Sequence, residues 1–100
     1  MREEIRTYML DKATILNIIW DMMEFQHGKA TVNDIKNGRI SFRAQMYNVP
    51  CDYHFLLREQ NDGCMVCLST EGNAADIALF RAFSLMESLM AKPRDTVISG

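Results

Sequence analysis

The sequence predicts an α+β fold: an N-terminal helix, a four-stranded antiparallel β-meander and a C-terminal helix, with both helices on one face of the sheet. Three observations support this prediction. Apolar residues recur at helical spacing near both ends of the chain, they alternate with polar residues through the middle, and turn residues separate the alternating stretches. With 100 residues, 48% of them hydrophobic, residues 1–100 are predicted to form a single domain with a modest core.

The first predicted helix covers residues 12–25. Its apolar stripe has three- and four-residue spacing and consists of Ile15, Ile18, Ile19, Met22 and Met23. Asp11 is placed to cap the start of this helix, and Gly28 to end it. The preceding residues 1–10 are also compatible with a helix, so the pattern leaves open whether there is one long helix or two.

Four strands are predicted between the helices, over residues 30–35, 39–47, 51–59 and 64–70. The pair Asn37-Gly38 is the strongest hairpin signal, because both residues accept a positive φ. A second turn centred on Asn48 and Val49 brings the apolar faces of two strands together. The predicted apolar pairs are Met46–Cys51, Ala44–Tyr53, Phe42–Phe55 and Ile40–Leu57, with Arg43 opposite His54 and Gln45 opposite Asp52.

The last predicted helix covers residues 73–91. Asn73 is a favourable N-cap with Asp76 three residues later, and Pro93 ends the helix. The remaining residues 93–100 are predicted to form a flexible tail.

This last helix carries more apolar positions than one contact stripe against a sheet requires. Burying a Leu, Phe or Met side chain contributes roughly 1.5–3 kcal/mol, so leaving several exposed forgoes much of a typical stability of about 5–15 kcal/mol. The excess predicts an interface with another chain; the alternative is that the helices and sheet bury all of it internally. The predicted interface residues are Phe80, Phe83, Leu85, Met86 and Met90.

Cys64 and Cys67 form a C-x-x-C pattern, which can indicate a redox or zinc site. In a strand, residues three apart point to opposite faces, and their Cα atoms lie about 10 Å apart at ~3.3 Å per residue. A disulfide requires less than about 7 Å. The pattern therefore predicts small, buried apolar side chains, without a metal or cofactor.

Polar residues on the opposite sheet face offer a different kind of site. Asp52 and His54 share that face, and Arg43 lies beside them. These three residues could hold a small ligand or support catalysis, but a solvated polar surface is the simpler account of them. The sequence contains no glycine-rich phosphate loop, H-E-x-x-H or G-x-S-x-G motif, and no catalytic residue is predicted.

The formal net charge of −2 provides no basic field for nucleic acid or an anionic membrane, so neither is predicted as a partner. The most apolar stretch, residues 15–25, is too short to span a bilayer. An odd number of cysteines, three, favours a reducing compartment, and a cytoplasmic location is predicted.

The stretch "GKATVNDIKNGRISFRAQMYNVPCDYHFLLREQNDGCMVCLS" resembles the opening half of type III secretion chaperone-like domains, including the YbjN-like group. Those domains also show a helix, a glycine hairpin before an I-x-F strand, two further strands and a helix. Additional strands and a last helix follow in that family, and the present sequence stops before them. The resemblance implies an acidic cytoplasmic homodimer that binds a protein client without catalysis, with a helix at the dimer interface.

Three functions follow as expectations. The first is a non-enzymatic, chaperone-like protein-binding module that acts as a homodimer through the apolar helix. The second is a small inhibitor or immunity-type protein that neutralises a phage or toxin target. The third is a small-ligand or enzyme site on the outer face of the sheet.

Overall fold

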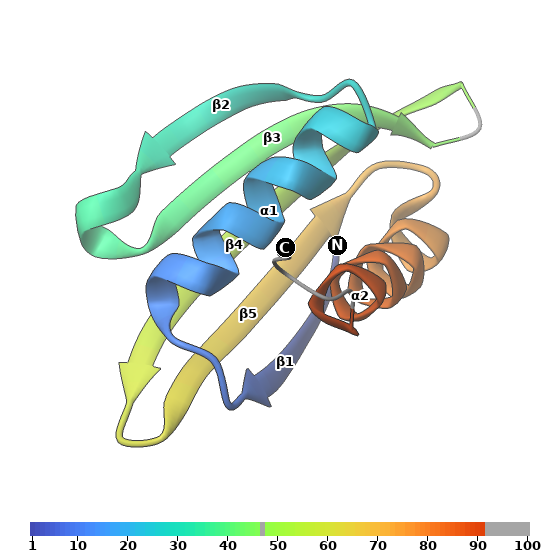
Figure 1. Cartoon of the computed structure of the whole chain (residues 1–100). Helices are drawn as coiled ribbons and strands as arrows, with labels where there is room; N and C mark the ends of the chain where they lie inside the picture. Colours follow the sequence, from blue (N-terminus) through green and yellow to red (C-terminus); the bar gives the residue numbers. More distant parts are fainter. Residues whose placement is uncertain (47, 92–100) are drawn as a thin grey trace, which may run out of the picture.

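The computed structural model describes residues 1–46 and 48–91 and shows an α+β fold with a five-stranded antiparallel sheet and two helices (Figure 1). The elements, in chain order, are β1 (Arg2–Tyr8), α1 (Lys12–Phe25), β2 (Lys29–Asp34), the short 3-10 turn η1 (Ile35–Asn37), β3 (Arg39–Met46), β4 (Val49–Gln60), β5 (Gly63–Glu71) and α2 (Ala75–Ala91). The strand order in the sheet is β1-β5-β4-β3-β2. The predicted α+β class and antiparallel sheet are confirmed, whereas the predicted number of four strands is wrong.

The additional strand is β1. It pairs antiparallel with β5 over its whole length, from Arg2 opposite Thr70 to Tyr8 opposite Cys64. The possible helical extension over residues 1–10 is therefore wrong. The charged residues of this segment are compatible with a helix or a strand. Pairing with the edge of β5 gives the backbone N–H and C=O groups of the segment hydrogen-bond partners, and this favours the strand.

The first helix has the predicted bounds. The Asp11 carboxylate accepts a hydrogen bond from the backbone N–H of Thr14 at 2.9 Å, which confirms the predicted cap. At the other end the helix stops at Phe25, three residues before Gly28, with Gln26 as its C-cap. His27 takes a positive φ of 54°, so the chain leaves the helix through a residue other than the predicted glycine.

The hairpin between β3 and β4 keeps the predicted faces but has a different register. Ala44 lies opposite Cys51, and Phe42 lies opposite Tyr53, which is a shift of two residues from the predicted pairs. Asn48, at φ 66°, adopts the left-handed conformation in the shorter turn. A shift of two residues leaves every side chain on the same face, so the apolar pattern cannot distinguish the two registers.

The reversal at Asn37-Gly38 is present, but as a 3-10 turn followed by a left-handed glycine. Gly38 has φ 72°, and its N–H donates to the carbonyl of Ile35 at 3.0 Å. At the far end of the sheet, α2 begins at Ala75, later than the predicted Asn73, after the Ala75 N–H donates to the carbonyl of Gly72. Pro93 and the predicted tail over residues 93–100 lie outside the described residues.

Both helices lie on the same face of the sheet, as predicted, with α2 over the side formed by β5 and β1 (Figure 1). They cover the apolar faces of β3, β4 and β5, where the rings of Phe42 and Tyr53 stack with centroids 4.7 Å apart. The largest fully buried side chains include Tyr53, Phe42, Phe83, Ile15, Ile18, Ile19, Met22 and Leu68. Within the described ranges, neither helix is long and apolar enough to cross a membrane.

Candidate functional site

The five predicted interface residues of α2 divide between the core and the surface. Phe83 and Met86 are buried within the chain, and Leu85 and Met90 are half-buried against the core. Phe80 alone among them is open, with 68% of its surface exposed. Ile77, which precedes it by one helical turn, is 49% exposed. We call Ile77 and Phe80 the apolar ridge of α2.

The flank of α2 next to the ridge is tied to β1 by charged side chains. Arg2 forms an ion pair with Asp76 at 2.8 Å, one turn before Phe80. Further along the helix, Glu87 accepts hydrogen bonds from Arg6 and from the Tyr8 hydroxyl, both at 2.7 Å. Phe80 lies one helical turn after Asp76 and two turns before Glu87, so it shares the side of α2 that borders β1.

Arg6 is the centre of this contact. Its guanidinium carbon lies 4.3 Å from the ring centroid of Phe83, a cation–π geometry, and it also pairs with Glu4. The hydrogen bond to Glu4, with that to Glu87, raises the pKa of Arg6 above its usual value. Burial, with the bond to Glu87, likewise raises the pKa of Tyr8. Both groups therefore keep their protons at neutral pH, and they dock α2 onto β1.

Replacing Glu87 with glutamine is expected to remove part of the acid sensitivity of the fold. Hydrogen bonds from Tyr8 and Arg6 hold the pKa of Glu87 below its ordinary value of 4.5. The stabilisation by the carboxylate is therefore complete above that value and is lost as the pH falls through the lower folded value. Urea unfolding should show Glu87→Gln to be less stable than the wild type by under about 1 kcal/mol near pH 7, because the pair is half-exposed.

The same difference should shrink as the pH falls through the lowered folded-state pKa of Glu87, and it should vanish once the carboxylate is protonated in both states. Glu24→Gln is a matched control, because Glu24 is exposed on α1 and away from this network. A Glu87 difference that persists unchanged in acid would contradict the electrostatic account.

The outer face of the sheet brings Arg43, Asp52 and His54 close together. Arg43 lies directly opposite Asp52, where the sequence placed His54, and it donates two hydrogen bonds to the carboxylate at 2.8 and 3.1 Å. This bidentate contact lowers the pKa of Asp52 and raises that of Arg43. Much of the charge of both groups is thus already neutralised within the protein.

His54 belongs to a different set of contacts, with two residues that the sequence reasoning did not single out. Its Nδ1 atom lies 2.8 Å from the Ser41 hydroxyl, and its Nε2 atom lies 3.3 Å from a carboxylate oxygen of Glu71. The shift of two residues in the β3–β4 register is what puts Ser41 across from His54. A shallow hollow of about 390 Å³ opens over Ser41 and His54.

Two features of this serine–histidine–glutamate row are unfavourable for acyl transfer. Ser41 is only 6% exposed, so a substrate carbonyl has little access to its hydroxyl. The row lies on β3, β4 and β5, the three interior strands, whose backbone N–H groups are committed to the ladders on either side. An oxyanion therefore finds no free backbone donors there in the described part of the sheet. The predicted ligand site at Arg43, Asp52 and His54 stays a prediction.

The two cysteines of the C-x-x-C pattern lie on opposite faces of β5, which confirms the predicted placement. Cys64 is buried on the helix-covered face. Cys67 is on the outer face and only partly buried, so the prediction of a buried side chain is wrong there. Its thiol lies 3.3 Å from a carboxylate oxygen of Glu3. Burial raises the pKa of both thiols, and the carboxylate of Glu3 adds to this effect at Cys67. Neither thiol is activated as a nucleophile by this environment.

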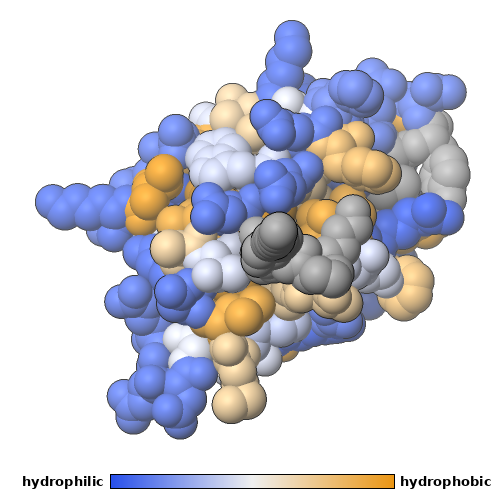
Figure 2. All heavy atoms as spheres, viewed as in Figure 1, coloured by the Kyte–Doolittle hydropathy of each residue, from blue (hydrophilic) through white to orange (hydrophobic). Residues whose placement is uncertain are grey.

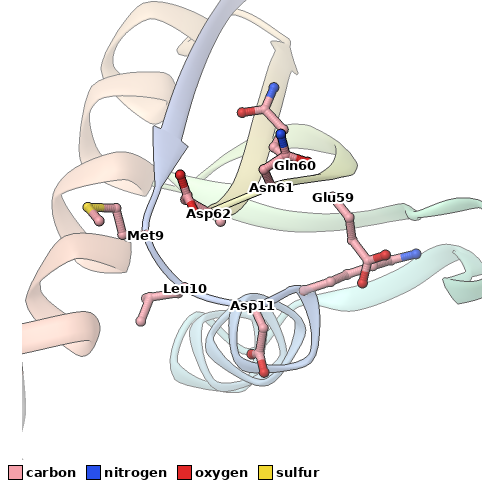
Figure 3. Close-up of a pocket in the computed structure, with 9 residues that line it drawn as sticks. Met9, Leu10, Asp11, Glu59, Gln60, Asn61 and Asp62 are labelled. Atoms are coloured by element: carbon pink, nitrogen blue, oxygen red, sulfur yellow. The ribbon is translucent and has the colours of Figure 1, made fainter.

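Another hollow, of about 460 Å³, lies between the β1–α1 connection and the β4–β5 turn. Its lining includes Asp11, Glu59 and Asp62, but the labelled side chains in Figure 3 point in different directions. The Asp11 carboxylate is already used as the cap of α1. The described residues contain no group of acidic, histidine or cysteine side chains arranged to hold a metal ion.

No family model matches the sequence, and no curated protein matches it.

Proposed function

We propose that the protein is a non-enzymatic, chaperone-like protein-binding module that acts as a homodimer through the exposed apolar ridge of α2. The observation that supports this proposal is that Phe80 and Ile77 stay exposed although the other large apolar side chains of α2 are buried or half-buried by their own chain. A large aromatic side chain on an otherwise polar helix face is typical of an interface anchor. The resemblance to type III secretion chaperone-like domains implies the same assembly, a cytoplasmic homodimer that binds a protein client.

The ridge is an anchor and not a whole interface. Figure 2 shows hydrophobic atoms on this side of the molecule in several small patches among hydrophilic ones. Burying Phe80 and Ile77 on both copies contributes at most about 6–12 kcal/mol, at roughly 1.5–3 kcal/mol per side chain, which only falls within the ~4–15 kcal/mol that association costs in lost freedom. A stable dimer must therefore use the surface next to the ridge as well.

Replacing Phe80 with aspartate is expected to weaken self-association at least about tenfold, because a charge would replace a buried anchor. Sedimentation velocity at two protein concentrations measures the effect, and circular dichroism checks the fold, which should be retained because Phe80 is exposed. Ser88→Asp is the matched control, since it adds the same charge at an exposed position of the same helix.

Two results would contradict the proposal. A wild-type chain that is monomeric at both concentrations would exclude the homodimer and favour the small-inhibitor hypothesis. An unchanged dimer in Phe80→Asp would mean that another surface carries the assembly.

A further inference from the structure

We propose that the second copy docks on β1: two β1 strands pair antiparallel about a two-fold axis at Ile5, and the two five-stranded sheets join into one of ten strands. This inference rests on the proposed homodimer and names the surface that completes it. It uses the backbone edge of the sheet together with the ridge of α2.

The sheet has two edge strands, β1 and β2, and they differ in their readiness to pair. β1 is regular, with seven consecutive residues in register with β5. β2 carries an irregularity between Ala30 and Val32, where its register with β3 shifts. Such bulges distort an edge and discourage further pairing. In the described residues β1 therefore offers the better template for an added strand.

Charged side chains on an edge strand ordinarily prevent pairing with another strand. Whether two β1 strands can pair therefore depends on the order of positive and negative residues along β1. With Ile5 opposite Ile5 of a second copy, Glu4 of each chain faces Arg6 of the other. Two ion pairs then flank a contact between two isoleucine side chains, each now 57% exposed. Glu3 faces Thr7, and Arg2 faces Tyr8, so no like charges lie opposite each other.

Neighbouring registers lack this complementarity. A shift of two residues is the smallest that keeps the helices of both copies on the same face of the joined sheet. In one direction it sets Glu4 against Glu4 and Arg2 against Arg6. In the other it sets Arg6 against Arg6. The sequence of β1 thus selects one same-face register for pairing with itself.

The position of α2 agrees with this docking mode. The ion pair of Arg2 with Asp76 and the bonds of Glu87 to Arg6 and Tyr8 hold α2 alongside β1, parallel to the strand. Phe80 lies between these contacts on the same flank. A two-fold axis at Ile5 therefore brings the Phe80 side chains of the two copies to either side of the axis, next to the joined strands.

Cysteine cross-linking tests the register directly. Ile5 pairs with Cys67 within one chain, so the experiment uses a Cys67→Ser background to avoid an internal disulfide. In that background, Ile5→Cys should give a covalent dimer under mild oxidation, because opposite residues of antiparallel strands lie within about 5.5 Å. Thr7→Cys is the control on the same face of the same strand. Its Cα atoms would be offset by roughly 13 Å along the strands, too far for a disulfide.

The outcomes separate this inference from the proposed function. A dimer with the Ile5 cross-link and no Thr7 cross-link supports both. A dimer that cross-links through Thr7, or through neither residue, overturns the β1 pairing and leaves the homodimer intact. A protein that is monomeric before oxidation overturns both.

A charge-swap experiment tests the ion pairs without any disulfide. Glu4→Arg alone sets Arg against Arg6 of the second copy, and Arg6→Glu alone sets Glu against Glu4, so each variant should self-associate at least about tenfold more weakly. An equimolar mixture restores both opposite-charge pairs, and a heterodimer should form. A mixture that associates no better than its separate components would overturn the register. If Arg6→Glu fails to fold because it loses its contact with Phe83, the cross-linking result decides.

Discussion

Replacing Phe83 with alanine is expected to lower the free energy of unfolding by about 3–5 kcal/mol, the range for a large aromatic side chain removed from a core. Phe83 is 1% exposed, and its ring receives the guanidinium group of Arg6 at 4.3 Å. The substitution leaves a cavity where α2 meets the sheet and removes the apolar surface on which Arg6 rests. Urea unfolding followed by circular dichroism measures the loss.

Phe80→Ala is a matched control, because the same side chain is removed three residues earlier on the same helix. Phe80 is 68% exposed in the single chain, so its removal should change the unfolding free energy by less than about 1 kcal/mol when measured at concentrations where the monomer predominates. Equal losses for the two variants would contradict the assignment of Phe83 to the core and Phe80 to the surface.

The contrast between these two phenylalanines shows why the sequence alone overestimated the interface. The sequence predicts a four-stranded sheet beneath α2, without β1. The structure adds β1, which widens the surface beneath α2, and the stem and guanidinium of Arg6 cover part of Phe83. β1 and Arg6 thus cover much of the apolar surface that the sequence assigned to an interface. Two large apolar side chains of α2, Ile77 and Phe80, remain exposed.

β1 could not be predicted from local pattern. Ile5 is the only aliphatic side chain among residues 2–8, and it lies on the exposed face. The other side chains are charged or polar apart from the partly buried Tyr8. The sequence therefore shows no apolar–polar alternation, although the side chains do alternate between exposed and partly buried positions in the fold. Its structure depends on pairing with β5, more than fifty residues away in the chain, and such a tertiary effect is absent from local propensity.

The central strands were predictable because their buried and exposed residues alternate clearly. β4 and β5 alternate between buried and more exposed positions along most of their length, which fixes their faces. The grouping of Arg43, Asp52 and His54 on one face followed from this alternation. Their detailed partners did not follow, because a register shift of two residues keeps the faces and changes every neighbour. Ser41 was missed for this reason, whereas Glu71 lies one residue beyond the strand predicted over residues 64–70.

Replacing Gly38 with alanine is expected to cost at least about 2 kcal/mol of unfolding free energy. Gly38 has φ 72°, a conformation that costs a residue with a Cβ roughly 1–2 kcal/mol. A Cβ there would also lie 2.4 Å from the carbonyl oxygen of Leu57, a backbone atom of a central strand. The turn has little freedom to move away, because the Leu57 N–H donates to the Gly38 carbonyl at 2.8 Å.

Asn48→Ala separates the two contributions. Asn48 has nearly the same backbone conformation, φ 66°, but it is exposed and already carries a Cβ. Alanine there tests the left-handed conformation without a new clash, and the expected loss is about 1 kcal/mol or less. A loss in Gly38→Ala that exceeds both this value and the roughly 1–2 kcal/mol cost of a Cβ at positive φ then reports the close approach of the turn to β4. If the two variants lose the same amount in urea unfolding, the contact with Leu57 relaxes freely and the turn is not held against the sheet.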